Sequence, residues 1–146
     1  MSFLFNSFEG WKQYCEANNV ELFEAVIEYE TVQKGKQEQA IWDGLQQAYE
    51  VMKDAVETGL NEEMTSRSGM INNGAKKVFK HPVAVLSPEF QRLISRALAA
   101  KEVNSCMGRV VAAPTAGASG ILPGTLYTLQ EIHELSDRKI LEGLLV

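Results

Sequence analysis

The chain has 146 residues, a formal net charge of −5 and a pI near 5.1. That length fits a single domain with its own core, and the acidic balance argues against nucleic acid or an anionic membrane as partner, because few cations are left to replace counterions. No basic segment precedes an apolar run at the start, and no window reaches the length of a membrane span. We therefore expect a cytoplasmic protein without a membrane partner.

The first part of the sequence predicts three helices. Ser7 is a suitable N-cap for a first helix that ends at Asn18 and Asn19. A second apolar stripe runs over residues 20–33 and stops before a Lys-Gly-Lys run. Residues 37–60 form a long third helix, which Gly59 is expected to close as a C-terminal cap.

Glutamates recur along the second of these helices. Without a histidine among them, they favour a solvated helix face over a metal site. They are Glu21, Glu24, Glu28 and Glu30. The large apolar residues of the third helix indicate core packing rather than a cofactor site; they are Trp42, Tyr49 and Met52.

A polar, glycine-punctuated segment follows at residues 65–77 and predicts a loop that enters a helix at Gly74. It is no P-loop, because Ala75 separates that glycine from the lysine. Its hydroxyls and lysine suit a small anion, although an ordinary surface loop explains the composition equally well. The candidate anion-binding residues are Ser66, Ser68, Gly69 and Lys77. His81 precedes Pro82 in extended chain and is expected to be structural or exposed.

The remaining helices have clear sequence signals. Ser87, Pro88 and Glu89 form a helix start of hydroxyl cap, first-turn proline and acid. We expect that helix to run into Asn104 and to bury an apolar face made of Phe90, Leu93, Ile94, Ala97 and Leu98. Further helices are predicted over residues 125–134 and from Asp137 onward, with His133 on the surface. The fold class is therefore all-α, a single domain of about six or seven helices with a Gly-rich loop.

The Gly-rich loop, residues 104–124, is too poor in large side chains to be a packing element. Its glycines allow the backbone to approach a small ligand closely, and free N–H groups before a helix favour an anion. The candidate binding residues are Asn104, Thr115, Ala116, Gly117, Ser119 and Gly120. On chemistry alone, the chain is a helical domain with a small-anion site.

The same stretch resembles a known family. Glu102-Val103-Asn104, followed by the run from Met107 to Gly124 that contains Ala-Pro-Thr-Ala-Gly, is similar to the signature of the iron–sulfur-dependent L-serine dehydratases, specifically the alpha chain of the two-chain form. Residues 66–70, with Ala75 and Lys77, resemble that family's earlier Ser-Gly loop. The resemblance covers most of the chain.

This resemblance implies a lyase of amino-acid degradation and gluconeogenesis that converts L-serine to pyruvate and ammonia without pyridoxal phosphate. Three cysteines hold its four-iron four-sulfur cluster, and the open iron acts as a Lewis acid on the serine hydroxyl. The two loops would then bind the substrate, with the Thr115 and Ser119 hydroxyls and the backbone N–H groups holding its carboxylate.

The departures from the family are equally informative. Its cluster cysteines are expected beyond Val146, so no metal ligand is expected here: Cys15 is predicted to be a buried apolar residue, and Cys106 stands where relatives have a small residue. The catalytic histidine is expected on a beta chain, so His81 and His133 do not inherit that role. We expect an N-terminal portion of the alpha-chain catalytic domain, inactive alone and part of a hetero-oligomer. The alternative is a non-catalytic helical module that binds a small anion or a partner protein.

Overall fold

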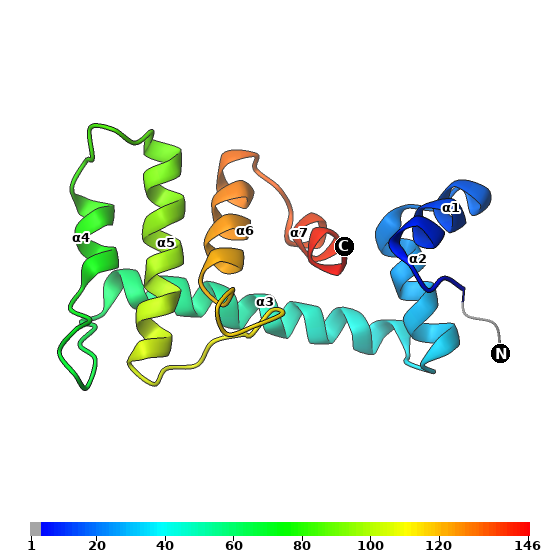
Figure 1. The fold of residues 1–146 in the computed structure, drawn as a ribbon, viewed down its shortest axis with the longest axis horizontal. Helices are drawn as coiled ribbons and strands as arrows, with labels where there is room; N and C mark the ends of the chain where they lie inside the picture. The colour runs from blue at the N-terminus through cyan, green and yellow to red at the C-terminus, as the bar shows by residue number, and fades with distance from the viewer. Residues whose placement is uncertain (1–3) are drawn as a thin grey trace. The chain divides into compact units, whose positions relative to one another are not determined.

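The computed structural model describes residues 4–146, and over that range the chain is helical (Figure 1). Its only extended pairing there is an isolated bridge between Thr65 and Asn72. The predicted all-α class is confirmed. The elements are α1 (Phe8–Asn18), α2 (Leu22–Glu28), a π-helical segment η1 (Tyr29–Gln33), α3 (Glu38–Asn61), α4 (Gly74–Lys80), α5 (Pro88–Ser105), α6 (Ile121–Ile132) and α7 (Asp137–Leu145).

These elements form two compact units. The first comprises the described residues up to Gln46 together with Asp137–Val146, and the second comprises Gln47–Ser136. Helix α3 contributes its first residues to the first unit and the rest to the second. The two loops that the sequence singles out belong to the second unit.

The helix starts follow the predicted capping signals. The Ser7 hydroxyl accepts a hydrogen bond from the Gly10 N–H at 3.1 Å, and the Ser87 hydroxyl accepts one from the Phe90 N–H at 3.2 Å. Asn19 ends α1 in the left-handed conformation, with φ of 52°. These local signals are strong because a side chain satisfies N–H groups that the helix itself leaves free.

The first unit packs around Trp42, which is buried. Phe23 meets its ring edge-on at a centroid distance of 6.2 Å, and the Arg138 guanidinium of α7 lies 3.4 Å from the ring centroid. The predicted solvated face of residues 20–33, which form α2 and η1, is only partly correct, because the Glu30 side chain of η1 is 16% exposed and forms ion pairs with Lys34 and Lys36 at 2.6 Å each.

In the second unit, α5 approaches its neighbours through glycines. A Cβ on Gly59 of α3 would lie 2.4 Å from the Ala99 carbonyl oxygen. On the other side, a Cβ on Gly120 would lie 2.5 Å from the Ala97 carbonyl oxygen, and one on Gly124 would lie 2.6 Å from the Ala97 nitrogen. The expected C-cap at Gly59 is therefore wrong: α3 continues to Asn61, and this glycine serves helix packing.

This close packing changes two further expectations. Helix α6 begins at Ile121, so Pro123 and Gly124 are buried residues of its first turn rather than loop residues. Helix α5 exposes Phe90 and Leu98, at 51% and 39%, so the apolar face predicted for this helix is not the face that it buries. Its buried residues are Ser95, Arg96, Ala99, Ala100, Glu102 and Val103.

Arg96 is the polar centre of the α5–α6 contact. Its side chain is 9% exposed, donates to the Thr128 hydroxyl at 3.2 Å, stacks on the Tyr127 ring at 4.5 Å and pairs with Glu131. Arg92 pairs with the same carboxylate. Hydrogen bonding to the Arg96 guanidinium holds the pKa of Glu131 below its usual range.

The glycine contact predicts opposite effects for two substitutions in α3. Gly59→Ala should lower the free energy of unfolding by about 1–3 kcal/mol, because the new methyl group meets backbone atoms of α5. Gly44→Ala is the matched control: a Cβ there meets nothing within 4 Å, so the change should raise stability by about 0.5–1 kcal/mol. Urea unfolding followed by circular dichroism measures both, and equal effects would contradict the packing role of Gly59.

The Glu131 ion pairs predict a pH-dependent stability. A carboxyl whose pKa is lowered by folding contributes stability above its unfolded pKa of about 4.3 and loses it as the pH falls through the folded value. Glu131→Gln should therefore cost less than about 1 kcal/mol near pH 7, since the side chain is 40% exposed, and nothing near about pH 3. Unfolding at both pH values tests this. Glu62→Gln is the control, because Glu62 is exposed and forms no ion pair with any described residue; a Glu131→Gln deficit that persists in acid would contradict the assignment.

Candidate functional site

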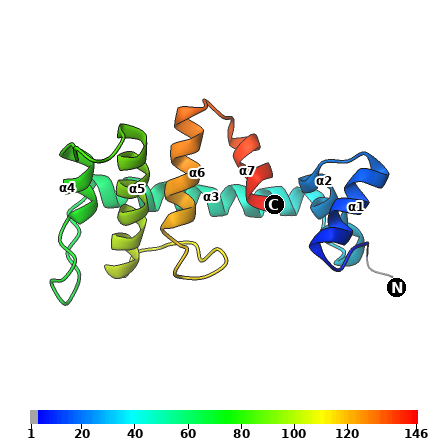
Figure 2. The same ribbon diagram turned by 45° about the horizontal axis from the view of Figure 1, so that its top comes forward.

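The two predicted loops lie at the same end of the second unit, next to the C-terminal end of α5 (Figures 1 and 2). The Lys101 ammonium donates to the Ala116 carbonyl at 3.2 Å. The Glu102 Oε1 atom accepts the N–H groups of Gly74 and Ala75 at 2.8 and 3.2 Å. Because Lys101 and Glu102 are consecutive residues of one helix, both loops share a single support.

The Ser66 loop, residues 65–73, is a tight reversal of the chain. The Ser66 carbonyl accepts the Gly69 N–H at 2.8 Å, and Gly69 has a positive φ of 73°, which glycine adopts without strain. The Ser66 hydroxyl accepts the Ile71 N–H at 3.0 Å and lies 3.2 Å from the Ser68 hydroxyl. Ser66 is thus a buried part of the framework, whereas Ser68 and Gly69 are exposed.

The end of the Ser66 loop is held by side chains. The Lys77 ammonium donates to the Asn72 carbonyl at 2.9 Å, and the Asn73 Oδ1 atom accepts the Met64 N–H at 2.7 Å. Asn73 Nδ2 also donates to Glu63, which Lys76 pairs with at 2.9 Å. The Lys76 ammonium holds the pKa of Glu63 below its usual range. The predicted site residue Lys77 therefore anchors the loop while remaining exposed to solvent.

The Thr115 turn, residues 115–120, precedes α6. The Thr115 carbonyl accepts the Ala118 N–H at 3.1 Å, and the Ser119 hydroxyl donates to the Ala116 carbonyl at 2.7 Å. The N–H groups of Ala116 and Gly117 form no hydrogen bond with any residue from 4 to 146, and both residues are exposed. This turn presents free donors beside the Thr115 hydroxyl.

The predicted residues of the Thr115 turn divide into two groups. Thr115, Ala116 and Gly117 are exposed, while Ser119 is 1% exposed and Gly120 is buried against α5. At the end of α5, the half-buried Asn104 accepts the Met107 N–H through its backbone carbonyl at 3.1 Å, and its side-chain amide forms no hydrogen bond within the described chain.

Two residues that organise this region were not among the predicted site residues. Glu102 appeared only as the first residue of the family signature, and Lys101 carried no signal. A charged residue near the end of a helix usually faces solvent, so a carboxylate at position 102 gave no indication that it would be 6% exposed. The contacts of both residues depend on segments 15 to 28 positions away in the sequence.

The cysteines and histidines are not part of the Ser66 loop or of the Thr115 turn. Cys15 is a buried residue of the first unit, as predicted, and burial raises the pKa of its thiol. Cys106 packs against the core of the second unit. His81 and His133 are exposed, in agreement with the expectation for each. Over residues 4–146, no three His, Cys, Asp or Glu side chains are grouped as a metal site requires.

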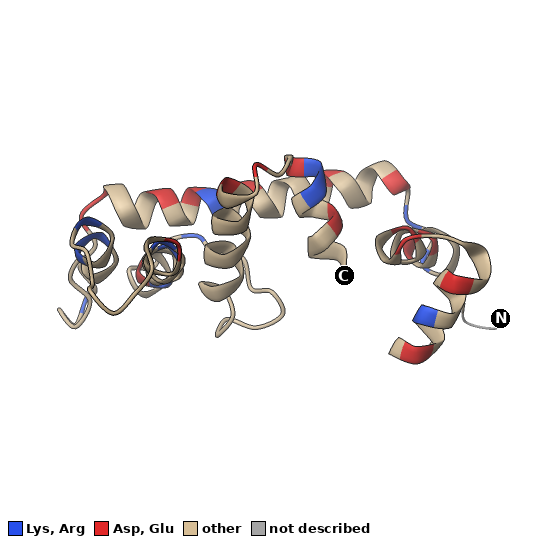
Figure 3. Cartoon of the chain, turned by 90° about the horizontal axis from the view of Figure 1, so that it is seen from above, with Lys and Arg blue, Asp and Glu red and all other residues tan. Residues whose placement is uncertain are grey.

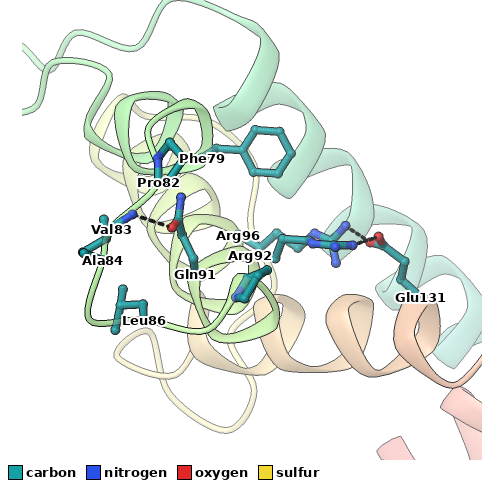
Figure 4. Close-up of a pocket in the computed structure, with 10 residues that line it drawn as sticks. Phe79, Pro82, Val83, Ala84, Leu86, Gln91, Arg92, Arg96 and Glu131 are labelled. Atoms are coloured by element: carbon teal, nitrogen blue, oxygen red, sulfur yellow. Dashed lines mark hydrogen bonds and ion pairs between the residues drawn. The ribbon is translucent and has the colours of Figure 1, made fainter.

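A separate groove of about 510 Å³ lies at the start of α5 (Figure 4). The Gln91 amide donates to the Val78 carbonyl at 2.6 Å and to the His81 carbonyl at 3.0 Å, and its oxygen accepts the Val83 N–H at 2.9 Å. Arg92 and Arg96 in this groove are paired with Glu131. Its lining residues are Phe79, Pro82, Val83, Ala84, Leu86, Pro88, Gln91, Arg92, Arg96 and Glu131. None of them belongs to the two loops.

Charge and hydropathy add two observations on the described part of the chain. Acidic residues predominate on α3, whereas α7 carries both acidic and basic residues (Figure 3). None of the helices described here combines the length and the apolar composition that crossing a bilayer requires.

Comparison with known proteins identifies relatives over most of the sequence. The family model described as serine dehydratase alpha chain matches residues 17–146. A probable L-serine dehydratase alpha chain of Bacillus subtilis is 35% identical over 107 residues, which cover 71% of this chain and 35% of that protein. An L-serine dehydratase alpha chain of Peptoniphilus asaccharolyticus is 27% identical over 134 residues, covering 90% of this chain and 46% of that protein.

An L-serine dehydratase of Streptomyces coelicolor is also similar, with 33% identity over 98 residues that cover 63% of this chain and 21% of that protein. The chain therefore spans less than half the length of these relatives. The matched region contains the Ser66 loop, the Thr115 turn and the α5 segment that supports both. The chain belongs to the serine dehydratase alpha chain family.

Proposed function

We propose that this chain is the substrate-binding part of an L-serine dehydratase, a lyase that converts L-serine to pyruvate and ammonia. The observation that carries the proposal is the Thr115 turn, which exposes the free N–H groups of Ala116 and Gly117 beside a hydroxyl. Backbone N–H groups and a hydroxyl are the donors that a carboxylate needs, and L-serine carries one.

Two further features favour an anion at the Thr115 turn. Helix α6 starts immediately after it, at Ile121, and a helix N-terminus carries partial positive charge. The exposed Lys101 ammonium of α5 donates to the carbonyl of Ala116, so a cation lies against the same turn. In this proposal, Thr115 contacts the substrate carboxylate, whereas Ser119 acts indirectly by fixing the Ala116 carbonyl through its 2.7 Å hydrogen bond.

The Ser66 loop supplies the second side of the proposed site. The exposed Ser68 hydroxyl and the Lys77 ammonium lie on it or next to it, and the Asn104 amide lies at the nearby end of α5. The Ser68 hydroxyl and the Asn104 amide are suited to the ammonium and hydroxyl groups of serine, since both can donate and accept, whereas the Lys77 ammonium only donates and is suited to an oxygen atom of the substrate. Ser66 and Gly69 give this loop its shape through the turn described above.

The complete enzyme would hold a four-iron four-sulfur cluster, and this cluster would act as a Lewis acid on the substrate hydroxyl. The residues of this chain do not fit such a cluster. The sequence has two cysteines, Cys15 and Cys106, which lie in different units, and three thiolates are needed. We therefore place the cluster ligands outside residues 1–146 and the catalytic histidine on a beta chain, and limit the role of this chain to binding and orienting the substrate.

The proposed carboxylate contact predicts a change in KM. In the complete enzyme, Thr115→Ala should raise the KM for L-serine about tenfold, equivalent to about 1.4 kcal/mol, with kcat nearly unchanged, because a contact made equally in ground and transition states is lost. Steady-state kinetics with L-serine measures this. The control is Thr31→Ala, since among residues 4–146 that hydroxyl bonds only to the Glu28 carbonyl, three residues earlier in the chain. An unchanged KM for Thr115→Ala would refute the contact.

The cysteine content predicts that the 146-residue chain alone holds no cluster. Anaerobic incubation with iron, sulfide and a thiol, followed by desalting, should leave it without the broad visible absorption of a four-iron cluster and without activity on L-serine. The expected cause is the number of thiolate ligands. A stable brown species with about four iron atoms per chain would contradict this part of the proposal.

A further inference from the structure

Glu102 forms an unusual cap for a neighbouring helix. The first N–H groups of any α-helix lack partners within that helix, and in α4 two of them, on Gly74 and Ala75, are bound by Oε1 of Glu102 from α5. The Glu102 side chain is buried, at 6% exposure, and its Oε2 atom has no hydrogen-bond partner among the described residues. Burying a carboxylate costs free energy unless hydrogen bonds compensate for the lost solvation. The two N–H groups of α4 supply that compensation for Glu102.

The backbone around this contact is shaped to receive the carboxylate. A Cβ on Gly74 would lie 2.8 Å from Oε1, so a side chain there would push the carboxylate away. Asn73 adopts the left-handed conformation, with φ of 55°, and turns the chain from the Ser66 loop directly into α4. The position of the Glu102 carboxylate therefore fixes the point at which the Ser66 loop ends.

The preceding residue holds the other loop. Lys101 donates to the Ala116 carbonyl, which the Ser119 hydroxyl also contacts. Two adjacent residues of α5 thus contact the Thr115 turn and the start of α4, which directly follows the Ser66 loop. A shift of either contact would change the distance between the Ser66 loop and the Thr115 turn.

We propose that Glu102 is a positioning residue of the substrate site: by capping α4 it holds the Ser66 loop in register with the Thr115 turn. This inference rests on the proposed function. Both N–H groups bond to the same oxygen atom, Oε1. An uncharged amide oxygen at the same position could accept both bonds, so the role should depend on the length of the side chain rather than on its charge.

Two substitutions in the complete enzyme separate reach from charge. Glu102→Asp keeps the charge but shortens the side chain by one methylene, and it should raise the KM for L-serine about tenfold. Glu102→Gln keeps the length, and its amide oxygen accepts the same two N–H groups, so the KM should stay within about twofold of the wild-type value. A KM raised as much by Gln as by Asp, or by neither, would overturn the inference.

A core variant separates positioning from general destabilisation. Val56→Ala removes part of a fully buried side chain of the second unit, and it should lower Tm without changing the KM. An equal rise in KM for Val56→Ala and Glu102→Asp would assign Glu102 a merely structural role. If Thr115→Ala raises the KM and Glu102→Asp does not, the inference fails and the proposed function stands; an unchanged KM in Thr115→Ala refutes the proposed function itself.

Amide hydrogen exchange tests the structural step without any activity. In the complete enzyme, the Gly74 and Ala75 N–H groups should owe their protection to Glu102, so their exchange should become about tenfold faster in Glu102→Asp and change little in Glu102→Gln. Exchange at the Ser66 loop should follow the same order. Unchanged exchange at Gly74 and Ala75 in Glu102→Asp would overturn the inference at its first step.

Discussion

At three glycines, helix α5 comes within contact of the backbone of α3 and of the start of α6. The absence of a Cβ at Gly59, Gly120 and Gly124 lets α3 and α6 approach Ala97 and Ala99 to within contact of the peptide groups. This close approach fixes the distance between the helices and their position along one another, because one additional methyl group at the contact would force the helices apart. The C-terminal end of α5 is thereby fixed in position. The contacts of Lys101 with the Thr115 turn and of Glu102 with the start of α4 are made from this fixed end.

The sequence predicted the features that local chemistry decides. Helix starts at Ser7 and Ser87, the helical class and the loop at residues 65–73 follow from capping residues, apolar spacing and glycine content. Prediction from the sequence failed for residues whose structural role depends on a partner far away in the chain. Gly59 stands near a helix end, where a glycine cap and a packing glycine have the same local signature, and only the position of Ala99 distinguishes them.

The candidate site shows the same division. The Thr115 turn was predicted from its glycines and hydroxyls, and the structure adds which groups are exposed: Thr115 is, and Ser119 is not. Sequence reasoning could not find Lys101 or Glu102, because a charged residue on a helix has no pattern that reveals a contact with a loop many residues away. Both loops lie within residues 17–146, the region that matches the family model.

The free donors of the Thr115 turn have a consequence for substrate choice. Main-chain N–H groups and a single hydroxyl recognise a carboxylate, and a carboxylate is common to every amino acid. The Ser119 bond and the Lys101 contact fix the Ala116 carbonyl, so under the proposed function the turn would not have to be ordered before it binds. Under the proposed function it contributes affinity for amino acids as a class, and discrimination in favour of serine belongs to whichever groups meet the side-chain hydroxyl.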